Sequence, residues 1–247
     1  MIHISYFSAT GNTKYLAKHL GKLLNLEDDQ IALFGNEIPS SCSHLILMFP
    51  INGFNPPRPV KKHFNQITKG INKLSLIAVG CNNAFVNDAV TLPLKKSFSG
   101  ELCVDRVLAM PLTFITPFPD EVGKKSVEES LNKLKQIKEE ILEEKYTKKK
   151  VSIKSKIIHT LGKLESPAAR LFGLELHASD KCSSCGICWS TCPFGNIKNN
   201  KGKPKFGFKC GLCMKCIYTC PEKAISPYVS KFIPIKDGYD INRYLKK

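Results

Sequence analysis

Several features that would place this protein in a membrane, in the secretory route or among the nucleotide-binding enzymes are missing from its sequence. No apolar run approaches the roughly 18 residues that a membrane-spanning helix needs. Residues 1–7 lack the pattern of a secretory signal, in which basic residues precede a long apolar stretch. The loops G-x-x-x-x-G-K-S/T and G-x-G-x-x-G, which bind nucleoside triphosphates and dinucleotides, are absent. We therefore expect a soluble, cytoplasmic protein that binds its ligands through other motifs.

Acidic residues are scarce, and most of the excess of basic over acidic residues lies near the C-terminus. The chain has 21 Asp and Glu against 37 Lys and Arg, a formal net charge of +16. Residues 181–247 have a net charge of +10, whereas residues 1–147 have a net charge of only +2. A basic region of this kind indicates a solvated surface, an acidic partner or nucleic acid, or a counter-charge for a bound anionic group.

Length and composition predict a packed protein with more than one part. The 247 residues exceed what a single small core requires, and 43% hydrophobic with 23% charged residues excludes a disordered chain. Short apolar runs alternate with helical patterns in the first part, as in a doubly wound parallel α/β sheet. Strands are expected near residues 2–7, 30–34, 44–49, 74–80 and 102–110. Helices are expected near residues 16–24, 60–67, 88–98 and 120–145.

The composition changes at the lysine-rich residues 147–150. The apolar side chains that follow predict one or two short helices interrupted at Ser166 and Pro167, which pack on one or both neighbouring parts. We therefore divide the chain into residues 1–147, a helical linker at residues 148–175 and a small module at residues 176–247.

Cysteine is concentrated in the small module. Eight of the eleven cysteines lie between Cys182 and Cys220, in two copies of the pattern C-x2-C-x2-C-x3-C-P offset by 28 residues. This crowding indicates metal binding rather than disulfides. Structural zinc is the main alternative, although zinc sites normally use C-x2-C pairs separated by a longer loop. Cys42 and Cys103 lie in or beside predicted strands, where a small core residue is the ordinary role.

The repeated pattern resembles that of bacterial ferredoxins with two [4Fe-4S] clusters, in which the fourth cysteine of each run binds the other cluster. The resemblance implies a small α+β ferredoxin-like domain with two sets of ligands. One set would be Cys182, Cys185, Cys188 and Cys220. The other would be Cys192, Cys210, Cys213 and Cys216.

A hydroxyl-rich turn follows the first predicted strand and opens the first predicted helix. Gly11 permits close approach of the backbone, and the helix N-terminus adds oriented N–H groups and a partial positive charge. The turn could also be a simple helix cap. It resembles the phosphate loop of flavodoxins, which implies a phosphate of FMN there. The residues concerned are Ser8, Thr10, Gly11, Asn12 and Thr13.

Flavodoxin-like folds bind ligands outside the carboxyl ends of the strands, where the strand order reverses. The resemblance therefore implies that the flavin ring lies between two loops. The first loop contains Pro50, Asn52, Gly53 and Phe54. The second contains Gly80, Cys81, Asn82, Asn83 and Phe85. Flavodoxins commonly hold the ring between Trp and Tyr, but neither loop has one, so either Phe54 and Phe85 replace them or the ring is partly exposed.

Taken together, the motifs resemble the fused flavodoxin/ferredoxin family of anaerobic prokaryotes over essentially the whole chain. The resemblance implies a protein that passes electrons between two [4Fe-4S] clusters, FMN and a redox partner. The basic module predicts an acidic partner, such as a ferredoxin or a flavodoxin. Two alternatives remain. One is an FMN-dependent reductase of a small molecule, and the other is a basic iron–sulfur protein that binds nucleic acid, although no nucleic-acid motif accompanies the charge.

Overall fold

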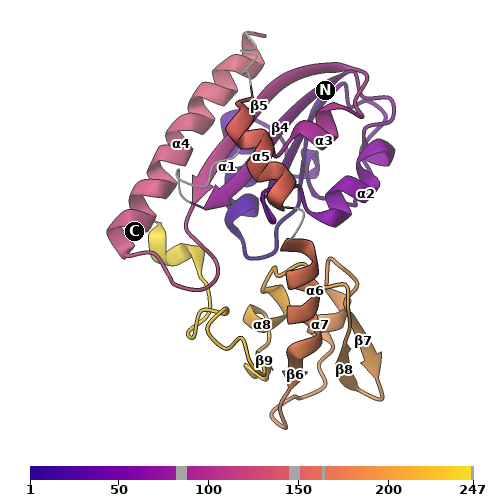
Figure 1. Cartoon of the computed structure of the whole chain (residues 1–247). Helices are drawn as coiled ribbons and strands as arrows, with labels where there is room; N and C mark the ends of the chain where they lie inside the picture. The colour runs from indigo at the N-terminus through magenta and orange to yellow at the C-terminus, as the bar shows by residue number, and fades with distance from the viewer. Residues whose placement is uncertain (82–87, 145–150, 163–164, 246–247) are drawn as a thin grey trace.

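The computed structural model describes residues 1–81, 88–144, 151–162 and 165–245 (Figure 1). Its largest element is a five-stranded parallel sheet with the order β2-β1-β3-β4-β5. The strands are β1 (Ile2–Tyr6), β2 (Ile31–Leu33), β3 (His44–Pro50), β4 (Lys73–Cys81) and β5 (Glu101–Met110). This is the strand order of the flavodoxin-like fold, so the predicted fold class is confirmed.

Helices cover both faces of the sheet, which explains why its central strands are continuous apolar runs. On one face, α1 (Asn12–Leu23) and α4 (Asp120–Leu142) enclose a core that includes Leu16 and Leu134. On the other face, α2 (Arg58–Ile67) and α3 (Leu92–Lys95) enclose a second core that includes Phe64. The strands present side chains to both cores, so β3 is buried from His44 to Phe49.

Two expectations about helices were wrong in detail. The helix expected at residues 88–98 is reduced to the four residues of α3, preceded by a turn, because Pro93 in its first turn provides no N–H to continue a helix backwards. The linker forms α5 (Ile153–Leu161) and α6 (Glu165–Glu175), but the break precedes Glu165. Pro167 lies in the first turn of α6, where a missing N–H is tolerated.

The C-terminal part is a small α+β module, as predicted. Strand β6 (Leu176–Ala178) pairs with β9 (Ile225–Pro227), and β7 (Ile197–Asn200) pairs with β8 (Lys203–Phe206), both antiparallel. Two short helices, α7 (Ile187–Ser190) and α8 (Lys215–Tyr218), each lie within one cysteine motif. Phe172 of the linker helix α6 completes the small core of this module, which ties the linker to it.

The repeat in the sequence is also a repeat of backbone conformation. Gly186 and Met214, 28 residues apart, have φ values of 83° and 58° and precede α7 and α8 respectively. Ser184 and Leu212, with the same offset, have φ values of 61° and 52°. Left-handed conformations are unfavourable for residues other than glycine. Their recurrence indicates that both cysteine loops require the same tight turn.

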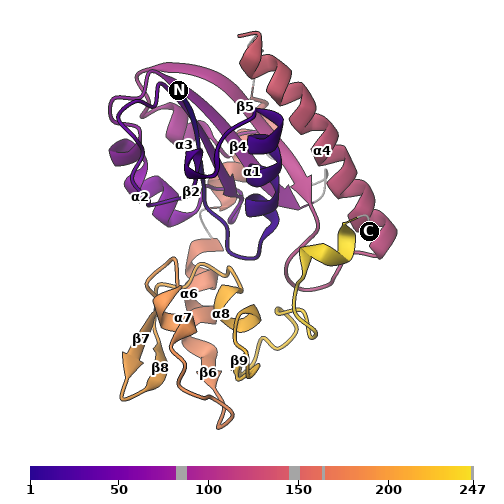
Figure 2. The ribbon, with the colours of Figure 1, turned by 180° about the vertical axis from the view of Figure 1, so that it is seen from behind.

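After the module, the chain returns to the larger domain (Figures 1 and 2). A short 3-10 helix, η4 (Ile241–Tyr244), lies beside α4, and Tyr244 is buried in the same core as Leu134. Gly123 of α4 makes room for this ring, because a Cβ there would lie 2.1 Å from Tyr244 Cδ1. The C-terminal segment is therefore packed as part of the first domain. Within the described residues, no helix is long and apolar enough to cross a membrane.

Candidate functional site

The carboxyl ends of β1, β3 and β4 border a cavity of about 90 Å³ that faces the cysteine module. The cavity is lined by most of the residues predicted for a flavin site and by two residues of the second cysteine motif. The predicted residues among them are Ser8, Thr10, Asn12, Thr13, Pro50, Asn52, Gly80 and Cys81. The two from the module are Leu212 and Cys213. We call this space the edge cavity.

The turn between β1 and α1 has the features of an anion-binding helix N-terminus. Gly11 is the N-cap with φ 109°, no side chain caps the helix, and no acidic residue lies in its first turn. A side-chain cap would occupy the first N–H groups of α1, so its absence leaves them to other acceptors. The edge cavity has room for about three water molecules, at ≈ 30 Å³ each. The turn therefore fits a phosphate group in size and chemistry.

The side chain of Asn12 is already used to hold this turn in place. Its Nδ2 donates to the carbonyl oxygen of Pro111 at 2.9 Å, and its Oδ1 accepts a hydrogen bond from the hydroxyl of Tyr239. Burial raises the pKa of Tyr239, so the phenol remains a donor at neutral pH. Tyr239 was missed by sequence reasoning because it lies 227 residues from Asn12 and belongs to no motif.

The first loop predicted to hold the flavin ring, at residues 50–54, contacts both the edge cavity and the linker. Asn52 lines the edge cavity and donates from Nδ2 to the carbonyl oxygen of Gly211 at 3.1 Å. Gly53 lies against α5, since a Cβ on Gly162 would be 2.0 Å from its carbonyl oxygen. The carbonyl oxygen of Phe54 is 3.1 Å from Nδ1 of His159. Gly53 and Phe54 thus contact the linker, while Asn82, Asn83 and Phe85 lie outside the described residues.

The eight motif cysteines line two further small cavities, each of about 20 Å³. The one nearer the sheet, called the inner site, is lined by Cys192, Cys210, Cys213 and Cys216. The other, called the outer site, is lined by Cys182, Cys185, Cys188 and Cys220. Each site thus takes three cysteines from one motif and the fourth from the other. In the described part of the chain, no three His, Cys, Asp or Glu gather as ligands of a single metal ion.

Burial disfavours free thiolates at the inner site. It raises the pKa of Cys213 to about 12, and it also raises the pKa values of Cys210 and Cys216. Such thiols ionise readily only when a positive charge such as a metal ion is bound. Main-chain N–H groups of Asn196 and Leu212 donate to Sγ of Cys192 and Cys210 at 3.3 and 3.4 Å. These donors would stabilise negative charge on sulfur.

Residues around the inner site are held against the larger domain. The Arg58 guanidinium donates to the carbonyl oxygen of Cys210 at 2.7 Å, and the rings of Phe7 and Phe194 pack edge to face at 6.2 Å. The Tyr218 hydroxyl donates to the carbonyl oxygen of Thr113 at 2.8 Å. As a result, Cys213 lines both the inner site and the edge cavity.

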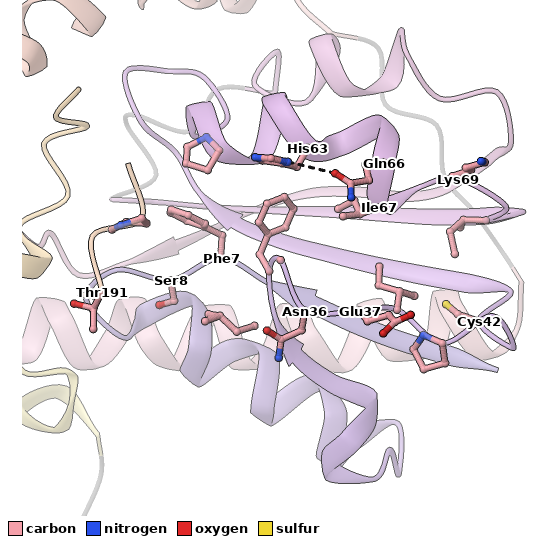
Figure 3. Close-up of a pocket in the computed structure, with 18 of the residues that line it drawn as sticks. Phe7, Ser8, Asn36, Glu37, Cys42, His63, Gln66, Ile67, Lys69 and Thr191 are labelled. Atoms are coloured by element: carbon pink, nitrogen blue, oxygen red, sulfur yellow. Dashed lines mark hydrogen bonds between the residues drawn. The ribbon is translucent and has the colours of Figure 1, made fainter. Parts of the chain in front are cut away.

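A larger cavity, of about 1140 Å³, lies elsewhere, between α2, the segment after β2 and the first cysteine motif. Figure 3 shows His63 and Gln66 of α2 on one side, Asn36 and Glu37 on the other, and Thr191 at one end. Cys192 of the inner site also belongs to its lining. This open groove therefore extends from the surface of the larger domain to the inner site.

Known proteins resemble parts of this chain. Residues 178–198 match the family model of a 4Fe-4S binding domain. Among solved structures, the FMN-bound flavodoxin of Fusobacterium nucleatum is 15% identical, with a TM-score of 0.40, and the match covers 59% of this chain and 98% of that one. Oxidised flavodoxin 1 of Bacillus cereus is 14% identical, with a TM-score of 0.40, and the match covers 57% of this chain and 97% of that one. A flavone reductase is 13% identical, with a TM-score of 0.38, and the match covers 84% of this chain and 81% of that one. No curated protein matched the chain.

The chain therefore joins a flavodoxin-like domain, defined by its strand order, to a 4Fe-4S binding domain. This is the arrangement of a fused flavodoxin and ferredoxin, and the resemblance described from the motifs is confirmed.

The contact between the C-terminal segment and the β1–α1 turn gives a first prediction. Tyr239→Phe removes the hydroxyl that Asn12 accepts from, and leaves a buried amide oxygen without that donor. Amide hydrogen exchange of residues 10–14 should become several-fold faster, measured by mass spectrometry. Tyr244→Phe, which removes the bond to the carbonyl oxygen of Phe118, is the matched control and should leave residues 10–14 unchanged. Equal protection of the turn in all three proteins would contradict the role of Tyr239.

Proposed function

We propose that this protein is an electron carrier that passes electrons between a redox partner, two [4Fe-4S] clusters and FMN. The observation that carries the proposal is the shared position of Cys213, which belongs to the inner site and to the edge cavity. Clusters accept single electrons, whereas FMN accepts one or two, so both together can connect one-electron and two-electron chemistry. The flavin domain would be residues 1–147, the linker residues 148–175 and the cluster module residues 176–247, with a C-terminal tail that packs on the flavin domain.

Two observations support FMN at the edge cavity. The uncapped α1 N-terminus, with Gly11, Thr10 and Thr13, supplies main-chain and hydroxyl donors for the phosphate. Asn52, Gly80 and Cys81 line the same cavity, on the side where the second loop begins. The cavity is smaller than the ≈ 300 to 1,000 Å³ usual for ligand pockets, so it accounts for the phosphate end of FMN. Placement of the flavin ring between the two loops remains a prediction.

The lining of the edge cavity favours a carrier over a reductase of small molecules. Among its described residues there is no His, Asp, Glu, Lys or Arg, and the titratable side chains are Cys81 and Cys213. Reduction of an organic substrate by hydride transfer normally needs a positioned proton donor. A carrier of electrons needs no such donor, and the described lining offers only these two thiols, while residues 82–87 of the second loop lie outside the described residues.

The grouping of cysteines supports two clusters with crossed ligands. Cys192 follows the first three cysteines in sequence but lines the inner site with the second motif, and Cys220 lines the outer site with the first motif. The spacing of the motifs and the match of the 4Fe-4S binding domain favour iron–sulfur clusters over zinc.

Cysteine replacement tests this arrangement. Cys192→Ser should alter the signal of the inner cluster alone. Cys220→Ser, at the equivalent position of the second motif, should alter the signal of the outer cluster alone. Iron and sulfide analysis with electron paramagnetic resonance of the reduced proteins measures both, and wild type should contain about eight iron and eight sulfide. The inner cluster is recognised independently as the one that Arg58→Gln perturbs, because Arg58 contacts Cys210. If Cys220→Ser, and not Cys192→Ser, changed that cluster, the crossed assignment would be wrong.

The basic charge of the module supports an acidic partner that approaches the outer site. Lys198 and Lys205 are directly opposite each other on the β7–β8 hairpin, although like charges in such pairs are destabilising. Lys203 of the same hairpin donates to the carbonyl oxygen of Cys182 at 2.8 Å, and Cys185 is exposed. The hairpin therefore places positive charge beside the outer site, where it would attract an acidic ferredoxin or flavodoxin.

Charge reversal tests the partner. Lys198→Glu with Lys205→Glu should slow electron exchange with an acidic ferredoxin about tenfold or more at low salt, measured by stopped-flow absorbance, and the difference should shrink above 0.1 M salt because of screening. Lys18→Glu with Lys22→Glu makes the same charge change on the exposed face of α1, away from its N-terminal turn, and should have little effect. Equal rates in the two variants would remove the steering role of the hairpin. Steeply salt-dependent binding of duplex DNA to wild type would favour the nucleic-acid alternative.

A further inference from the structure

A second cavity lies between the two parts of the chain, and its cationic side chains have no role in the electron path described above. It has a volume of about 310 Å³ and lies between the segment after β3, the start of α2, α6 and the second cysteine motif. Its lining includes three cationic side chains and, among the described residues, no Asp or Glu. The cations are Arg58, Lys61 and Arg170. We call it the arginine cavity.

Aromatic rings of the cluster module hold both arginines. The guanidinium carbon of Arg58 lies 5.4 Å from the ring centre of Phe194, and that of Arg170 lies 5.7 Å from the ring centre of Phe208. Cation–π contacts of this kind fix the plane of a guanidinium and leave its N–H groups available at the edge. The two side chains are thus oriented before any ligand arrives.

The hydrogen bonds of these two guanidiniums are incomplete. Arg58 donates to the carbonyl oxygens of Lys209 and Cys210, which use only part of its five N–H groups. Arg170 has a buried Nε with no hydrogen-bond partner. A buried donor without an acceptor is unfavourable, and more so in a charged group, so a bound acceptor at this position would be stabilising.

The positive charges of the two guanidiniums also have no carboxylate partner among the described residues. Arg58 contacts Cys210 directly, so an anionic group at the inner site would balance its charge. Neither arginine forms a salt bridge in the described part of the chain.

We propose that the arginine cavity binds a small oxyanion, a carboxylate or a phosphate ester, between Arg58 and Arg170. Arginine presents paired N–H groups that match the two oxygens of such groups. A volume of 310 Å³ is at the lower end of ligand pockets and suits a small metabolite rather than a nucleotide cofactor. Because Cys210 and Gly211 line this cavity too, the bound anion places negative charge beside the inner site and makes its reduction less favourable.

Calorimetric titration of the intact holoprotein with inorganic phosphate and with citrate, at constant ionic strength maintained with chloride, tests the proposal. Wild type should bind at least one of the two anions at a single saturable site, and the tighter one identifies phosphate or carboxylate as the preferred group. Arg170→Gln should weaken that binding at least tenfold, and Arg170→Lys should have an intermediate effect. Lys18→Gln removes the same charge from the exposed face of α1 and should bind as wild type does.

The reduction potential of the inner cluster provides a second readout. Saturating anion should lower it in wild type and leave it unchanged in Arg170→Gln. Absence of saturable binding of both anions, or equal binding by wild type and Arg170→Gln, would overturn the proposal. Because binding is measured by heat, this result does not depend on whether the protein exchanges electrons with an acidic carrier.

Discussion

The contact between the second cysteine motif and the carboxyl edge of the parallel sheet is the constraint on which the rest of the structure depends. Main-chain carbonyls of this motif are fixed by two side chains of the larger domain, Asn52 to Gly211 and Arg58 to Cys210. Both side chains follow β3, so the edge where a flavodoxin-like fold binds its ligand is also the edge that holds the cysteines. Cys213 is placed between the two sites as a consequence.

The chain crosses between its two parts twice, and both crossings reinforce this contact. The linker packs on the loop after β3 through Gly162 and His159, and its second helix contributes Phe172 to the core of the module. The C-terminal segment then returns to α4, inserts Tyr244 into the larger core and reaches Asn12 through Tyr239. Such a double connection limits relative motion of the parts, so the distance between inner site and edge cavity is expected to stay short.

The sequence predicted the features that depend on local pattern, and it missed those that depend on distant contacts. Apolar runs such as β3 predicted all five strands, and the 28-residue repeat predicted the paired cysteine loops. The prediction of a helix at residues 88–98 was wrong because it relied on the spacing of apolar residues and did not account for Pro93, which limits the helix to four residues. Two features had no signal in the sequence: the hydrogen bond from Tyr239 to Asn12, and the cavity that Arg58 and Arg170 line together. Each brings together residues more than one hundred positions apart.

Transfer of electrons within a single molecule is the central claim of this account. Its most direct test is anaerobic stopped-flow reduction of the clusters by a reductant that does not itself reduce FMN, with flavin absorbance followed at several protein concentrations. A flavin reduction rate that is independent of protein concentration, and that falls when Cys213→Ser disturbs the inner site, is the predicted result. A rate that rises in proportion to protein concentration would contradict the account, because electrons would then reach FMN only through collisions between molecules.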